Sequence, residues 1–446
     1  MVIVSAPTSP STTIIQVDVS DPVAPQILGS HTISGQYESA RMVQGTVRLV
    51  TSAEPTLRFQ YPDSDSWWDR RRATTANREI ITNSTLSQWV PGSVADCEET
   101  VRPAQFSGFG TVAVTTMQAA NPAEASSSSV ALVASPGTIY ASTDQLVVAG
   151  SEWQSEANDY ATNLHTFDIG STAPAEYAAS GQVRGRIVDQ FALSESEGII
   201  RVATTSEGQW DGPASSSTLF TLARDGADLT VLGSVEDLGV TEEIKSVRYL
   251  SPDLAAVVTF RQTDPLYLID TSEPADPVVR GELKIDGYSA YLHPIGDDHL
   301  LGIGQDADPS TGIEQGLQAS LFDISNLANP ELVDQLMWPG ASSLAESDHH
   351  AFTYWPQTGQ AFLPTWTYTP MVDPLAEESA YPVMSTGVSF TIEGESLIEG
   401  APLGTSAHQE GIERTMVIGD TLWTVTANGL NHYQLDTLRP LGSVNW

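Results

Sequence analysis

A repeat of about 50 residues constrains the fold of this 446-residue chain more than any other feature. In each copy a short apolar strand ends at an aspartate, and a proline follows within a few residues. The aspartates are Asp18, Asp168, Asp270 and Asp323; the last two are 53 residues apart, and the middle two are 102 apart, or twice 51. Asp and Ser side chains bond their own backbone and Pro ends a hydrogen-bond ladder, so each copy predicts a hairpin turn. A period near 50 that is built of strands is typical of propeller blades.

A second repeat, a polar strand followed by an apolar one, precedes the first in each unit. Examples are Ser246–Leu250 before Ala256–Phe260, and Ser289–His293 before His299–Ile303. The two repeats together predict an all-β propeller of about eight four-stranded blades, with seven as the alternative. Residues 1–446 would form one domain, in which 1–36 give an incomplete first blade without its innermost strand. The remaining blades fall near 37–135, 136–185, 186–239, 240–287, 288–340, 341–411 and 412–446.

Two insertions interrupt the period, at residues 62–108 and 366–383. The first contains Trp67-Trp68-Asp69-Arg70-Arg71-Arg72 and then a short helix expected from Ala76 to Gln88. Tryptophans at 67, 68 and 366 would either form an exposed aromatic platform for a glycan or protein, or pack against the propeller face.

Charge excludes some partners. The chain has 56 Asp and Glu against 19 Lys and Arg, a formal net charge of −37, which repels nucleic acid and anionic lipid. No apolar run approaches the roughly 18 residues of a membrane span. A single cysteine, Cys97, excludes an internal disulfide.

Polar residues recur on the strands expected to line a central channel. The expected ligand-binding positions are Arg41, Gln190, Arg248, His349 and Arg414, with His293 two residues further along its strand and on the same face. Arginine offers a bidentate fork to carboxylates and phosphates, so the set could bind a small anion or a carboxylate-bearing peptide. Alternatively, these side chains bond carbonyls and carboxylates of neighbouring blades and lock them together.

Two groups have metal-compatible donors. Asp306, Asp308 and Glu314 place hard oxygens around a glycine-bearing loop, which loosely fits calcium. The second group is Glu346, Asp348, His349 and His350 with His408 and Glu410, and it fits zinc or a similar cation. However, an alternating strand over Asp348–His350 would point adjacent side chains to opposite faces.

Several segments together resemble a family of secreted bacterial β-propeller proteins, distantly related to WD-repeat propellers. They include Gly281–Ile285, Tyr288–Pro294, Leu301–Asp306, Ser320–Ser325 and Asp348–Phe352. The resemblance covers nearly the whole chain and implies a secreted or cell-surface location. Members carry a signal peptide and a further N-terminal segment, so this chain is expected to be a trimmed copy. The family implies no biochemical role.

Catalytic signatures do not stand out, since the sequence has no G-x-S-x-G elbow and no phosphate-binding glycine loop. We therefore expect a monomeric, non-catalytic, extracytoplasmic binding scaffold. Its ligand would be a protein, peptide, glycan or small anion, and calcium is the one cofactor considered. The alternative is a hydrolase or lyase that uses the Arg/His set at the channel, with or without a metal; the shared fold does not decide between these classes.

Overall fold

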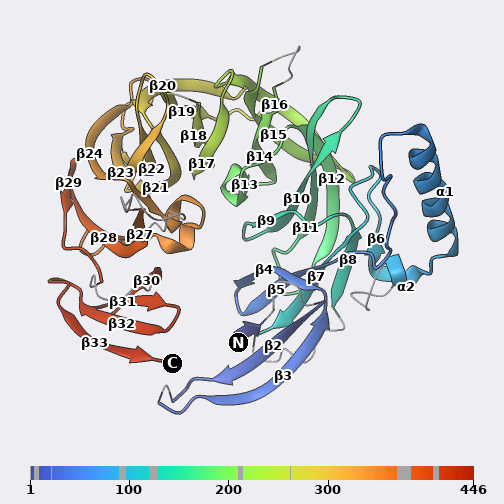
Figure 1. Cartoon of the computed structure of the whole chain (residues 1–446), viewed down its shortest axis with the longest axis horizontal. Helices are drawn as coiled ribbons and strands as arrows, with labels where there is room; N and C mark the ends of the chain where they lie inside the picture. Colours follow the sequence, from blue (N-terminus) through green and yellow to red (C-terminus); the bar gives the residue numbers. More distant parts are fainter. Residues whose placement is uncertain are drawn as a thin grey trace, which may run out of the picture. The chain divides into compact units, whose positions relative to one another are not determined.

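The computed structural model describes residues 2–4, 10–21, 23–89, 97–119, 128–208, 214–261, 263–368, 383–404 and 411–446. The chain divides into two compact units, Met1–Arg201 with Leu222–Leu232, and Val202–Thr221 with Gly233–Trp446. Each unit is built of blade-like sheets in which chain neighbours pair mainly antiparallel (Figure 1).

The first unit begins with a three-stranded sheet and continues with two larger ones. The first sheet is β1 (Val2–Val4), β2 (Ser11–Asp18) and β3 (Gln26–Ser34). The second is β4 (Gln36–Val43), β5 (Thr46–Ala53), β7 (Thr111–Gln118) and β8 (Ser129–Val133), with β6 (Thr100–Val101) beside β8. The third is β9 (Thr138–Ala141), β10 (Gln145–Gln154), β11 (Asp159–Asp168) and β12 (Glu176–Arg184).

The boundary between the units runs through the strands of the next sheet. That sheet is β13 (Leu193–Ser196), β14 (Ile199–Ser206), β15 (Ser216–Asp225) and β16 (Asp228–Leu238). A single parallel pairing, Ser180 with Asp228, joins β16 to β12.

The second unit continues with four sheets. The first is β17 (Glu243–Ser251), β18 (Leu254–Phe260), β19 (Thr263–Asp270) and β20 (Val278–Asp286). The second is β21 (Tyr288–Ile295), β22 (His299–Ala307), β23 (Glu314–Asp323) and β24 (Glu331–Pro339). The third is β25 (Ala341–Ser343), β26 (Thr353–Trp355), β27 (Gln360–Tyr368), β28 (Val383–Glu393) and β29 (Ser396–Glu399). The fourth is β30 (Ile412–Ile418), β31 (Thr421–Thr426), β32 (Gly429–Gln434) and β33 (Pro440–Asn445). The described residues thus form eight blade-like sheets, the first of them incomplete, which confirms the predicted fold class.

The turn repeat is confirmed at the level of hydrogen bonds. Each repeat aspartate ends the strand before the last one of its sheet and pairs with a residue eight positions later, as Asp18 does with Gln26 and Asp323 with Glu331. In three sheets its carboxylate accepts the backbone N–H of the serine two residues on, at 2.8–2.9 Å. Each pairing also shows a register shift directly before the turn. The same side-chain chemistry therefore builds the same turn in separate sheets.

A bulge in the innermost strands corrects the predicted alignment of the polar positions. Arg41, Arg248 and His293 each lie three residues after the bulged residue of their strand. His293 therefore occupies the same position as the two arginines, not one two residues further along its strand. Arg414 lies only one residue on, which is the position of Ser39. A bulge adds one unpaired residue to a strand, and a sequence pattern alone does not show where it falls. The unpaired residues are Glu38, Lys245, Ala290 and Glu413.

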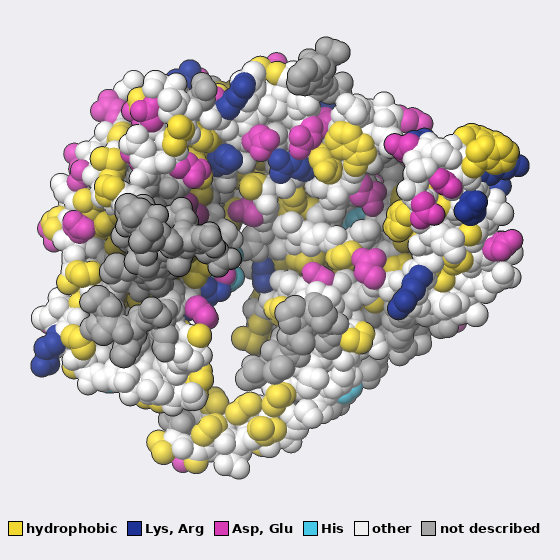
Figure 2. All heavy atoms as spheres, viewed as in Figure 1, with side chains coloured by type: hydrophobic (Ala, Val, Ile, Leu, Met, Phe, Trp, Pro, Cys, Tyr) yellow, Lys and Arg dark blue, Asp and Glu magenta, His cyan; other side chains and the backbone are white. Residues whose placement is uncertain are grey.

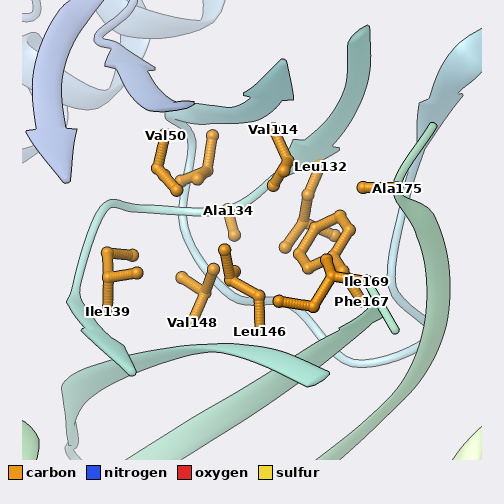
Figure 3. Close-up of a cluster of buried hydrophobic side chains, with 11 residues drawn as sticks. Val50, Val114, Leu132, Ala134, Ile139, Leu146, Val148, Phe167, Ile169 and Ala175 are labelled. Atoms are coloured by element: carbon orange, nitrogen blue, oxygen red, sulfur yellow. The ribbon is translucent and has the colours of Figure 1, made fainter. Parts of the chain in front are cut away.

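Sheets within a unit pack face to face through aliphatic side chains. In the first unit one cluster joins the sheet of β4–β8 to the sheet of β9–β12 (Figure 3). Phe167 from β11 is fully buried beside Leu132 from β8 and Leu146 from β10. Second and third strands are covered on both faces, and they read as runs of apolar and β-branched residues such as β5 and β18.

The first insertion carries two helices, α1 (Trp67–Asn83) and α2 (Leu86–Trp89), which lie beside β6 (Figure 1). The predicted start at Ala76 is wrong, because Ser66 caps the helix by accepting the N–H of Asp69. Within the second insertion, 366–383, residues 369–382 lie outside the described residues. At its start Trp366 pairs with Ser385 between β27 and β28. The expectation that 1–446 is one domain stays a prediction.

Candidate functional site

Asp348, His349 and His350 form a compact cluster in the second unit, and they do not lie on a strand as predicted. Asp348 caps the 3-10 helix η5 (His349–Ala351), and its carboxylate accepts both the backbone N–H and, at 3.0 Å, the Nδ1 of His350. A tight helical turn groups neighbouring side chains where a strand would separate them. One ligand atom from each of the three residues lies within 4.8 Å of the others, which is compatible with a metal ion.

The same aspartate also pairs with an arginine of the next sheet. Arg414 on β30 donates from Nη2 to Oδ2 of Asp348 at 2.5 Å, and both side chains are over a third exposed, at 38% and 36%. Burial acts to raise the pKa of Asp348, but the hydrogen bonds from His350 and the charge of Arg414 outweigh it and lower that pKa. A guanidinium that already occupies one carboxylate oxygen competes with a metal ion for this aspartate. Glu346 instead caps the preceding turn, and His408 and Glu410 lie outside the described residues.

His293 lies in an aromatic environment in the same unit. Its Nδ1 is 3.0 Å from the hydroxyl of Tyr291, and its ring lies 5.0 Å from Phe352 and 5.4 Å from Tyr354 between centroids. Burial, together with the charge of Arg248, lowers the pKa of His293 to about 4. The imidazole is therefore neutral near pH 7 and too weak a base for efficient proton transfer there. This geometry favours binding or packing over acid–base chemistry.

In the first unit, two more of the predicted positions meet. Arg41 on β4 donates from Nη2 to Oε1 of Gln190 at 3.0 Å, and from Nη1 to Ser39 and to the carbonyl of Ala40. Gln190 opens the 3-10 helix η3 (Gln190–Ala192) and, like His349, does not lie on a strand. Arg41 thus connects β4 to the short helix that precedes β13.

Sequence reasoning missed Arg48, which pairs directly with Arg41 across the β4–β5 hairpin. Arg48 is only 3% exposed, and its Nη2 donates to the carbonyls of Ser171 and Ala173 at 2.6 and 2.8 Å. A charged residue inside the apolar run of β5 was the available signal, because arginine is rarely buried without a partner.

The predicted calcium loop forms a hairpin turn that its own groups stabilise. Oδ1 of Asp308 accepts the N–H and hydroxyl groups of Ser310 and Thr311, and these bonds lower the pKa of Asp308. Glu314 accepts the hydroxyl of Tyr288 at 2.9 Å, while burial raises the pKa of Asp306 on β22. Calcium binding by these three carboxylates stays a prediction.

Helix α1 presents an aromatic and basic surface, defined here as Trp67, Trp68 and Arg70–Arg72 and called the α1 patch. Trp67 and Trp68 are 57% and 71% exposed and meet edge to face at 4.5 Å. The Arg71 guanidinium lies 5.1 Å from the Trp67 ring centroid. Figure 2 shows hydrophobic and basic atoms side by side where Figure 1 draws α1. Ala73 is the one buried residue of the helix.

Among the helices that the structure describes, none has the length and apolar character needed to cross a bilayer.

Repeated blade-like sheets of sequential strands define a β-propeller protein. A profile of the family described as "Beta propeller domain" matches residues 3–438, and the chain belongs to this family. An uncharacterized protein of Methanocaldococcus jannaschii is 40% identical over 207 residues, and one of Archaeoglobus fulgidus is 37% identical over 209. Each match covers 46% of this chain but only 30% and 31% of the relatives, so the chain spans under a third of their length.

Similar solved structures include Kuenenia stuttgartiensis hydrazine synthase, at 13% identity and a TM-score of 0.39, covering 68% of this chain and 77% of that one. A second is the β-propeller domain of the trilobed protease from Pyrococcus furiosus, at 7% identity and a TM-score of 0.36, covering 70% and 84%. Neither likeness bears on function. The predicted propeller family is confirmed, whereas the location outside the cytoplasm stays a prediction.

Proposed function

We propose that this propeller is a non-catalytic binding scaffold outside the cytoplasm and that the α1 patch binds an acidic segment of a partner protein. The exposed pair Trp67 and Trp68, with Arg71 against the first ring, is the observation that carries the proposal. Trp and Arg are the residue types most enriched at the energetic centres of protein interfaces. The location rests on the resemblance to secreted propellers.

Charge selects the class of partner. Helix α1 carries four arginines and two acidic residues, so it is locally cationic on a chain of net charge −37. The net charge of the chain repels an acidic partner at long range, so the basic, aromatic surface of α1 is a place where such a partner is attracted at short range. Arg71 lies against the Trp67 ring, where a sugar would otherwise stack, so a peptide is favoured over a glycan.

The polar positions that the sequence repeat singled out support the non-catalytic part of the proposal. Arg414 on β30 bonds Asp348, which caps η5, and Arg41 on β4 bonds Gln190 in η3, so both arginines are engaged by groups of the chain itself. The pKa of His293 near 4 argues against a hydrolase or lyase that would use it as a base at neutral pH.

A peptide library displayed on phage tests the proposal when it is panned against the full chain at low salt. We expect acidic peptides to be enriched and to bind at least ten-fold more weakly to Trp68→Ala and Arg71→Gln. Trp153→Ala is the matched control, because Trp153 is another exposed tryptophan of the same unit, at the end of β10. The proposal fails if no acidic sequences are enriched, or if they bind the α1 variants as tightly as the wild type.

A further inference from the structure

Arg41 and Arg48 face each other directly across the β4–β5 hairpin. Side chains of directly opposed residues in an antiparallel pair lie on the same face, with Cβ atoms about 5 Å apart. Two like charges at such a site repel each other, and this cost is usually removed by a nearby carboxylate.

No carboxylate of the described residues lies within 4.0 Å of either guanidinium. Arg41 bonds a serine hydroxyl, a backbone carbonyl and the Gln190 amide oxygen, which are all neutral. Arg48 bonds only backbone carbonyls, and its Nε and Nη1 are enclosed without any acceptor. In a chain with about three acidic residues for each basic one, two facing arginines without a carboxylate are an unusual arrangement.

A pocket of about 310 Å³ lies where these two arginines meet the loops of the next sheet. Its polar lining residues include Arg41 and Arg48, together with Gln44, Thr46, Thr143, Ser171 and Thr172. The carboxylate of Asp144 also belongs to the lining, and its Oδ2 accepts a hydrogen bond from the Thr143 hydroxyl. The lining therefore combines two arginines, one carboxylate and several hydroxyl-bearing residues, and the two cations outnumber the one anion.

The carbonyl contacts of Arg48 explain only part of its placement. Through Nη2 it holds the turn after β11, which a neutral donor could also do. Its buried charge, with two N–H sites unused, is costly unless an anion compensates it.

We propose that this pocket binds a small oxyanion, a carboxylate or phosphate group, between Arg41 and Arg48. Arginine matches the planar or tetrahedral oxygens of such groups, and the threonine and serine hydroxyls would complete the donor set. This site is separate from the α1 patch, and it does not depend on the function proposed for that patch.

Thermal melting and calorimetric titration with inorganic phosphate, and separately with citrate, test the pocket at ionic strength held constant with NaCl. We expect saturable binding to the wild-type chain, with Tm rising as ligand concentration rises. A preference for phosphate or for citrate identifies which oxyanion the site takes. Arg41→Gln should weaken binding at least ten-fold, and Arg48→Met should abolish it. Arg224→Gln, which removes an exposed arginine paired to Asp168 in the same unit, should bind like the wild type.

The stability of Arg48→Met gives a second readout. This variant removes a buried charge and also the donor to the Ser171 and Ala173 carbonyls, so the readout is the response of its Tm to ligand: the Tm should not change with phosphate or citrate. If Arg48→Met does not fold, Arg41→Gln decides alone, because Arg41 is only partly buried. The proposal is overturned if neither anion binds the wild type saturably, or if Arg41→Gln binds both with unchanged affinity.

Discussion

Acid should destabilise this protein through one buried histidine, His165 on β11. Its side chain is 2% exposed, its Nδ1 is 3.4 Å from the Tyr177 hydroxyl, and its Nε2 has no partner. Burial alone lowers the pKa of His165 from 6.5 to about 4. An imidazole with so few hydrogen bonds is kept neutral in the folded state.

The size of the effect follows from the difference between the folded and unfolded pKa. The folded pKa is depressed, so the stability is present above pH 6.5 and is lost as the pH falls toward 4, where the unfolded chain binds the proton more readily. With a pKa of 6.5 in the unfolded chain and about 4 in the folded one, the free energy of unfolding falls by about 2 kcal/mol at pH 5 and by about 3 kcal/mol below pH 4.

Urea unfolding of the wild type and of His165→Phe at pH 7 and pH 5 measures this loss. We expect the wild type to lose about 2 kcal/mol more than the variant between the two values, because every other titrating group contributes to both proteins. Tyr177→Phe is the control: it removes the neighbouring hydroxyl and keeps the buried imidazole, so it should lose as much as the wild type. Equal losses in the wild type and His165→Phe would refute the reasoning.

Two further predictions concern the links between sheets and the turns. Because Arg414 and Asp348 are each over a third exposed, Arg414→Gln should lower the free energy of unfolding by about 1 kcal/mol. Breaking a buried pair would lower it by about 3–5 kcal/mol. A double-mutant cycle with Asp348→Asn in urea checks this, and a coupling above 3 kcal/mol would contradict it. Gly287→Ala should lower the Tm far more than Gly296→Ala, because both have positive φ but only the former places a Cβ 2.0 Å from a backbone oxygen. Equal shifts in Tm would show that the close approach at Gly287 is unimportant.

The blades could be predicted because local chemistry determines them. An aspartate that accepts the N–H two residues on builds the same turn wherever it occurs, so Asp18, Asp270 and Asp323 mark equivalent strands without any knowledge of tertiary structure. The predicted blade limits agree with the sheets for the same reason.

The candidate sites were harder to predict because they depend on register and on capping. One bulge in each of several inner strands shifts Arg414 relative to Arg248, and a bulge has no reliable sequence signal. Similarly, Asp348 begins a helical turn where the strand repeat predicts a strand, which brings together two histidines that alternation would separate. Arg48 was missed because its importance comes from a cross-strand partner and from missing acceptors, which are both properties of the folded chain.

The placement of the few cations links both proposals to one physical argument. Some of the few cations have a carboxylate partner, as Arg224, Arg280 and Arg414 do. Arg48 and Arg71 have no such partner among the described residues, the first inside a pocket and the second on an exposed helix. Because salt screens exposed charges more than enclosed ones, raising the ionic strength should weaken peptide binding at the α1 patch more steeply than oxyanion binding at Arg48. The two sites therefore differ in how strongly binding depends on ionic strength, even though both attract negative charge.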